Sequence, residues 1–136
     1  MAFSAKVGET FYLKDNLDSH RHLYVVLTWP DNKGKVVVAN FTSAKFGKQK
    51  YVLFTPRDDG RLFKKDTTVE YTDASLVDRE KLIKHVKDDP NNYGIDCPMD
   101  IVREVVAGAF RAKQSPNKVL KELEKQYPEL YKKYYY

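Results

Sequence analysis

Two of the chain's three histidines stand close together in the segment SHRHLY, at residues 19–24. His20 and His22 are separated by one residue, and in a β-strand such residues project from the same face with attachment points about 7 Å apart. Imidazole titrates near neutral pH, so one ring can accept a proton while the other donates one. The spacing predicts acid–base chemistry around one phosphate, with Arg21 as a phosphate clamp if the segment leaves regular strand geometry. The alternative is two polar residues at the entrance of a strand.

A second cluster of polar groups follows in the segment NFTSAKFGKQK, at residues 40–50. The hydroxyls of Thr42 and Ser43 can donate hydrogen bonds to a phosphate oxygen, and the lysines add positive charge. The ring of Phe46 can stack on an unpaired base. The residues predicted here to bind RNA are Ser43, Lys45, Phe46, Lys48 and Lys50. A solvated loop, in which a hydroxyl completes a local turn, explains the same residues equally well.

A third cluster, formed by Lys64, Lys65 and Thr67, extends the basic stretch. Between residues 33 and 65 the chain carries nine basic side chains, and its only acidic ones are Asp58 and Asp59. Such a local excess of positive charge favours a polyanionic partner, and we expect RNA. The alternative is that the lysine pair keeps a sheet edge soluble.

Length and composition limit the remaining possibilities. The 136 residues, of which 42% are hydrophobic, suffice for one folding unit with a real core. The single cysteine, Cys97, cannot form an internal disulfide, and no phosphate-binding glycine loop or metal motif occurs, so we expect neither cofactor nor metal. No apolar run is long enough to span a membrane and no secretory signal opens the chain, so a cytoplasmic protein without a membrane partner is expected.

Hydrophobic periodicity predicts an α+β fold. Val-, Tyr- and Phe-rich runs predict strands near residues 9–13, 22–28, 35–41, 50–55 and 67–72. Helical periodicity predicts helices over 76–86, over 98–113 and from 116 onward, the last kinked or restarted at Pro128. We therefore predict a small, SH3-like, five-stranded β-barrel over residues 1–72. An extension of about three helices over 73–136 is expected to pack on it as one folding unit.

Three motifs in this order resemble the MazF/PemK family of toxin endoribonucleases over residues 7–77. They are GETFY at 8–12, HLYVVLT at 22–28 and VVVANFTS at 36–43, and residues 65–69 resemble the family's final strand. Thr42 and Ser43 match the family's threonine-containing pair. The family's Arg-Pro step falls on His22, with Arg21 one place earlier and without the proline.

The resemblance implies a metal-independent cut of single-stranded RNA, in which a 2′-hydroxyl attacks the adjacent phosphate. The products would be a 2′,3′-cyclic phosphate and a 5′-hydroxyl. It also implies a toxin–antitoxin system, with an antitoxin protein as partner and a homodimer as one assembly. In our specific hypothesis His22, or His20, transfers protons while Arg21, Thr42 and Lys45 bind phosphate. The alternatives are a non-catalytic nucleic-acid-binding barrel and a toxin that acts on a protein target such as gyrase.

Overall fold

The computed structural model describes residues 2–14, 21–44 and 51–136, and it has the predicted α+β character. The strands are β1 (Thr10–Lys14), β2 (Arg21–Val26), β3 (Lys35–Ser43), β4 (Thr67–Val69) and β5 (Ser75–Asp78). The helices are α1 (Arg79–Asp88), α2 (Met99–Ala112), α3 (Asn117–Gln126) and α4 (Pro128–Tyr134). Two 3₁₀ turns, Tyr71–Asp73 and Pro90–Asn92, connect them.

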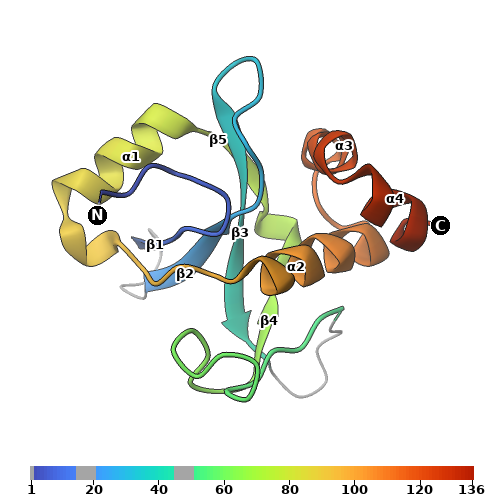
Figure 1. The fold of residues 1–136 in the computed structure, drawn as a ribbon, viewed down its shortest axis with the longest axis horizontal. Helices are drawn as coiled ribbons and strands as arrows, with labels where there is room; N and C mark the ends of the chain where they lie inside the picture. Colours follow the sequence, from blue (N-terminus) through green and yellow to red (C-terminus); the bar gives the residue numbers. More distant parts are fainter. Residues whose placement is uncertain (1, 15–20, 45–50) are drawn as a thin grey trace.

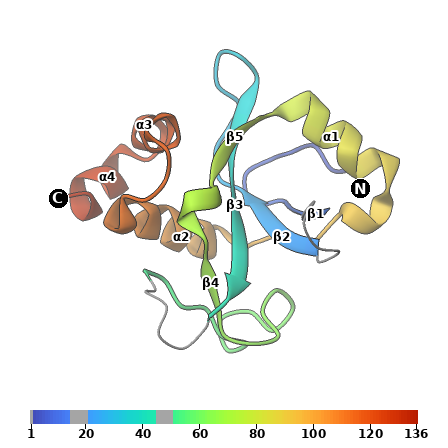
Figure 2. The same ribbon diagram turned by 180° about the vertical axis from the view of Figure 1, so that it is seen from behind.

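The nine-residue strand β3 organises the sheet (Figure 1). One of its sides pairs with β2, and β4 and β5 share its other side. Phe41 pairs with Val69, and Val38 pairs with Ser75. A step of three residues along β3 therefore corresponds to a step of six along the segment that lies beside it. The 3₁₀ turn Tyr71–Asp73 takes up the difference. β4 and β5 thus form one interrupted strand beside β3, as Figure 2 shows.

The sheet is antiparallel and open, with the order β1-β2-β3-β4 and with β5 also on β3, so the predicted closed barrel is not confirmed. In the described part of the chain, the two outer edges bond to other segments and not to each other. Gly94 N–H donates to the Thr10 carbonyl of β1 (3.0 Å), and Phe54 exchanges two bonds of 2.8 Å with Thr67 of β4. These segments cover the two edges of the open sheet, which a closed barrel would not have. Of the strand predicted at 50–55, the described residues 51–55 form only the bridge between Phe54 and Thr67.

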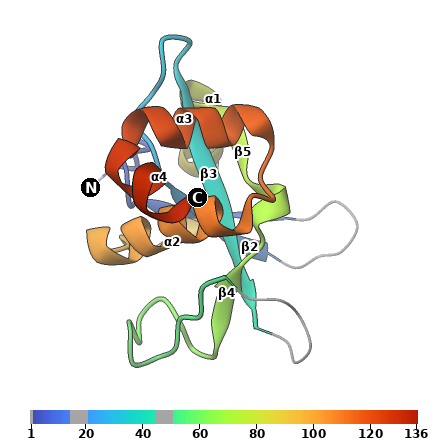
Figure 3. The ribbon, with the colours of Figure 1, turned by 90° about the vertical axis from the view of Figure 1, so that its right-hand side faces the viewer.

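Both faces of the sheet are covered, and β2 contributes apolar residues to each of them. Leu23, Val25 and Leu27 join one hydrophobic cluster, which α2 and α3 complete. Tyr24 and Val26 join the other, which α1 and the N-terminal segment complete. Figure 3 shows α2, α3 and α4 in front of the sheet and α1 behind it. The strand alternation, with period two, therefore places two helical layers on opposite sides.

The helices agree with the prediction except at the start of the first. α2 lies within the predicted range, and Pro128 restarts the helix as α4. The predicted helix over 76–86 begins too early, because Ser75–Asp78 pairs with β3 as a strand. The side chain of Asp78 then caps α1 by accepting a hydrogen bond from Lys81 N–H (3.0 Å). Among the described residues, no helix is both long and apolar enough to cross a lipid bilayer.

Candidate functional site

A cleft of about 240 Å³ lies between the start of β2, the end of β3 and the segment that leads into β4. The end of β3, β4 and the loop before it lie together in the lower part of Figure 1. Six residues predicted to bind or cleave RNA line this cleft, and they come from three separate stretches of the chain: Arg21, Thr42, Ser43, Lys64, Lys65 and Thr67. The fold therefore brings half of the predicted site residues into one depression.

The floor of the cleft is apolar and is held by aromatic packing. Phe41 and Phe63 line it, and both are almost completely buried. The ring of Phe63 stacks on Phe54 with centroids 5.1 Å apart and meets the ring of Phe41 edge-on at 5.2 Å. Such aromatic pairs stabilise a fold by more than the burial of their surface alone contributes. They fix the segment between residues 51 and 66, which has little regular structure, against the end of β3.

A tight turn presents the two lysines. The Asp59 carboxylate accepts hydrogen bonds from the backbone N–H groups of Arg61 (2.9 Å) and Leu62 (3.2 Å). Burial raises the pKa of Asp59, but these bonds and the nearby Arg61 charge outweigh it, and the net pKa is lowered. The Lys64 ammonium donates to the Gly60 carbonyl across the turn (2.8 Å). Asp59 therefore binds the loop backbone and pairs with Arg61 (3.5 Å), and both lysines remain exposed to solvent.

Thr67 has a structural part in the cleft. Its hydroxyl donates to the Lys65 carbonyl (2.8 Å), and its side chain is nearly buried. The hydroxyl proton is therefore engaged with the protein backbone. Lys65 itself is exposed at the rim. Thr67 thus positions Lys65, whereas the half-buried Thr42 and Ser43 border the cleft at the end of β3.

Arg21 enters the cleft from regular strand geometry, so its side chain lies on the face of β2 opposite that of His22, as this geometry predicts. It pairs with Lys14 as the first residue of β2. Its Nη2 donates to the Asn92 side-chain oxygen (2.7 Å) and to the Asn91 carbonyl (2.5 Å), and its guanidinium lies 4.8 Å from the centre of the Tyr12 ring. The exposed guanidinium is thus oriented by both an acceptor pair and an aromatic face.

His22 does not line this cleft, which corrects the expected convergence of His22 with Thr42. Arg21 and Leu23 both line it, and the residue between them in a strand projects from the opposite face. His22 pairs with Leu13 in the β1–β2 register. The other predicted residues, His20, Lys45, Phe46, Lys48 and Lys50, lie outside the described part of the chain.

Sequence reasoning missed Tyr12 and Asn92. Tyr12 faces Leu23 across the β1–β2 pair and so shares the cleft side of the sheet. The alternation of β1 could have placed Tyr12 on the cleft side, but only if the register of β1 with β2 were known. Asn92 lies in the turn after α1, and no local pattern links it to a residue at the start of β2.

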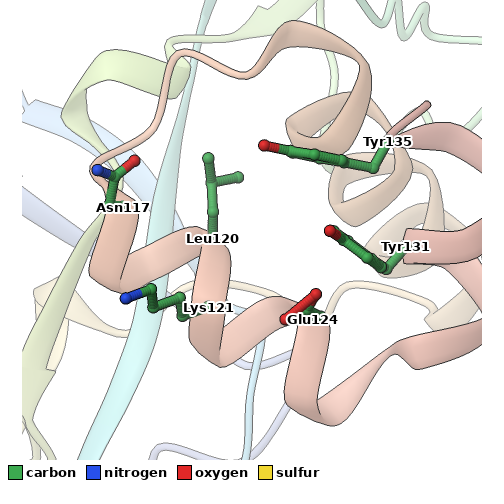
Figure 4. Close-up of a pocket in the computed structure, with 6 residues that line it drawn as sticks. All are labelled: Asn117, Leu120, Lys121, Glu124, Tyr131 and Tyr135. Carbon is green, nitrogen blue, oxygen red and sulfur yellow. The ribbon is translucent and has the colours of Figure 1, made fainter.

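A second cleft, of about 200 Å³, lies between α3 and α4 and is lined by Asn117, Leu120, Lys121, Glu124, Tyr131 and Tyr135 (Figure 4). The rings of Tyr131 and Tyr135 stack at 4.7 Å, and the Lys113 ammonium lies 4.5 Å from the centre of the Tyr135 ring. These ring faces contact one another and a cation of the protein, so they fasten α4 to the C-terminal end of α2. With its carboxylate, this cleft suits a polyanion less well than the first.

Comparison with protein-family models, with curated proteins and with solved structures gives no match. Within the described ranges, no group of three or more His, Cys, Asp or Glu side chains is placed to hold a metal ion. The cleft between β2, β3 and the segment before β4 is therefore the candidate functional site.

Proposed function

We propose that this protein is a toxin-like endoribonuclease that binds single-stranded RNA in this cleft and cuts it without a metal. One observation carries the proposal: Arg21 from β2, Thr42 and Ser43 from β3, and the lysine pair before β4 line the same depression. Cations and hydroxyl donors above an apolar floor are the groups that a phosphodiester and its unstacked bases require.

The proposed reaction needs these groups at one phosphate. The ribose O2′ forms a bond to phosphorus and the P–O5′ bond breaks, which yields a 2′,3′-cyclic phosphate and a 5′-hydroxyl without consuming water. A proton leaves O2′ and another reaches O5′. Negative charge grows on the non-bridging oxygens, where Arg21, Lys64 and Lys65 offset it and the hydroxyls of Thr42 and Ser43 donate hydrogen bonds.

A second candidate function is RNA binding without cleavage. It is favoured because none of the described residues that line the cleft carries an imidazole or a carboxylate. His22 projects from the other face of β2, and His20 lies outside the described residues. The two candidates share the same RNA-binding surface and differ only in whether a product forms.

The deciding experiment incubates the protein with 5′-labelled single-stranded RNA in EDTA and identifies the ends of any product. We expect a cyclic phosphate, and Arg21→Ala and Thr42→Ala should each lower the cleavage rate by about 10²-fold or more. Lys121→Ala, which removes an exposed cation of the α3–α4 cleft, is the matched control and should leave the rate unchanged. Circular dichroism checks that each variant is folded.

The outcomes separate the two candidates. RNA binding with no product supports the non-catalytic function, and the absence of both binding and product refutes both. His22→Ala should leave RNA binding unchanged, because the side chain lies outside the cleft. A loss of cleavage of about 10²-fold with binding retained would assign proton transfer to His22. Unchanged cleavage would remove His22 from the mechanism.

The proposal includes an antitoxin protein as partner. Its acidic segment would cover the same cationic rim and compete with RNA for Lys64 and Lys65. A co-purifying acidic protein that RNA displaces would support this part of the proposal.

A further inference from the structure

The orientation of Arg21 depends on a turn from the helical half of the chain. We propose that Asn92 is a positioning residue for Arg21, so that the turn after α1 completes the RNA cleft. This inference rests on the proposed function of the cleft. It gives the helical half of the chain a part in RNA binding, because the acceptors that hold Arg21 lie about seventy residues beyond it.

The turn that carries Asn92 is well defined. The Asp89 side chain caps it by accepting from Asn91 N–H (3.0 Å), and Pro90 occupies its first position. The chain that follows is fastened to β1, where Gly94 N–H donates to the Thr10 carbonyl (3.0 Å). A Cβ at Gly94 would lie 2.1 Å from the Thr10 hydroxyl, so only glycine permits this approach. The acceptor for Arg21 is therefore built on a fixed segment.

The Asn92 amide has a defined direction. Its Nδ2 donates to the carbonyl of His85 in α1 (3.4 Å), which leaves Oδ1 to face the guanidinium. The His85 ring in turn bonds to the backbone carbonyl of Tyr12 (3.0 Å), whose ring lies beside Arg21. Arg21 is thus held between the Asn92 amide, which α1 orients, and the Tyr12 ring, whose backbone carbonyl α1 contacts.

The chemistry of the acceptors matters as much as their position. Both acceptors, the Asn92 side-chain oxygen and the Asn91 backbone carbonyl, are neutral. They fix the guanidinium plane without cancelling its charge, so Arg21 keeps its full attraction for a phosphate. A carboxylate at residue 92 would hold Arg21 at least as firmly but would neutralise it.

Two neighbouring residues of the same turn offer a matched pair of variants. Asn92→Ala removes the side-chain acceptor, whereas Asn91→Ala keeps the backbone carbonyl through which Asn91 acts. We expect Asn92→Ala to weaken RNA binding by about tenfold, the usual scale for a hydrogen bond to a charged group, with its salt dependence unchanged. Asn91→Ala should bind like the wild type. Asn92→Asp should reduce the salt slope by about 0.7, because one cation is neutralised.

A second measurement needs no RNA. Arginine-selective ¹⁵N NMR reports how freely the guanidinium group of Arg21 rotates, and we expect restricted rotation in the wild type and in Asn91→Ala but not in Asn92→Ala. Free rotation in the wild type would overturn the inference. Equal RNA affinity for Asn92→Ala and Asn91→Ala would overturn it also, as would an unchanged salt slope in Asn92→Asp. A wild type that holds Arg21 but binds no RNA refutes the proposed function while leaving Asn92 as the group that orients Arg21.

Discussion

The change Lys65→Ala isolates the electrostatic part of the proposed RNA interface. The Lys65 ammonium is exposed at the rim of the cleft. Its backbone carbonyl, which accepts the Thr67 hydroxyl, remains in the variant. The substitution therefore removes one charge and leaves the local hydrogen bonds in place, and we expect the free energy of unfolding to stay nearly constant.

The size of the effect follows from the number of cations. Arg21, Lys64 and Lys65 are the cationic side chains among the described lining residues. For single-stranded nucleic acid each phosphate contact contributes about −0.7 to the slope of log affinity against log salt, so three contacts give about −2.1. Raising the salt from roughly 50 to 200 mM should then weaken wild-type binding about 20-fold. With two contacts the slope becomes about −1.4, and the same change weakens binding about 7-fold.

Fluorescence anisotropy with a labelled single-stranded RNA in EDTA measures both slopes. Lys121→Ala changes the net charge equally but acts at the α3–α4 cleft, so its slope should match that of the wild type. A Lys65→Ala slope equal to the wild-type value would refute the placement of RNA in this cleft. So would an equal reduction in both variants, because it would mean that only net charge matters.

Three further predictions concern stability and reactivity. Gly108→Ala should lower the urea midpoint, because a Cβ there would lie 2.1 Å from the Tyr71 hydroxyl, and overpacking of about 1–3 kcal/mol exceeds the gain of about 1 kcal/mol in helix propensity. Burial raises the pKa of Glu9, but hydrogen bonds from the N-terminal segment and Tyr93 outweigh it and lower the pKa below its ordinary 4.5. The stability that Glu9 contributes should therefore be complete above about pH 4.5 and should be lost as the pH falls through its folded-state pKa. Thermal unfolding at several pH values measures this dependence, which should be weaker in Glu9→Gln. Burial raises the pKa of Cys97 to about 12, so a disulfide reagent should label its thiol at mildly alkaline pH only after urea unfolds the protein; rapid labelling of the folded chain would contradict this.

Local patterns in the sequence were enough to predict the α+β class and most elements. Leu23 and Val25 of β2 belong to one hydrophobic cluster and Tyr24 to the other, as the two-residue alternation of a strand predicts. The hydrophobic periodicity of α2 and the restart of the helix at Pro128 were also predictable, because both depend on residues within a few positions of one another. The types of residue in the cleft, cations and hydroxyls, also followed from the local clusters of such residues along the chain.

The tertiary structure decided which of these residues meet. Whether Arg21 or His22 faces the cleft depends on which side of β2 packs against Phe41 and the segment before β4, and that choice reverses with a shift of one residue. Pairing with β3 made a strand of a segment whose apolar residues suited a helix equally well. The contact between Arg21 and Asn92 joins residues far apart in the chain, and only the packing of α1 against β1 brings them together. Periodicity reports which face a residue occupies, but only long-range packing determines what lies opposite that face.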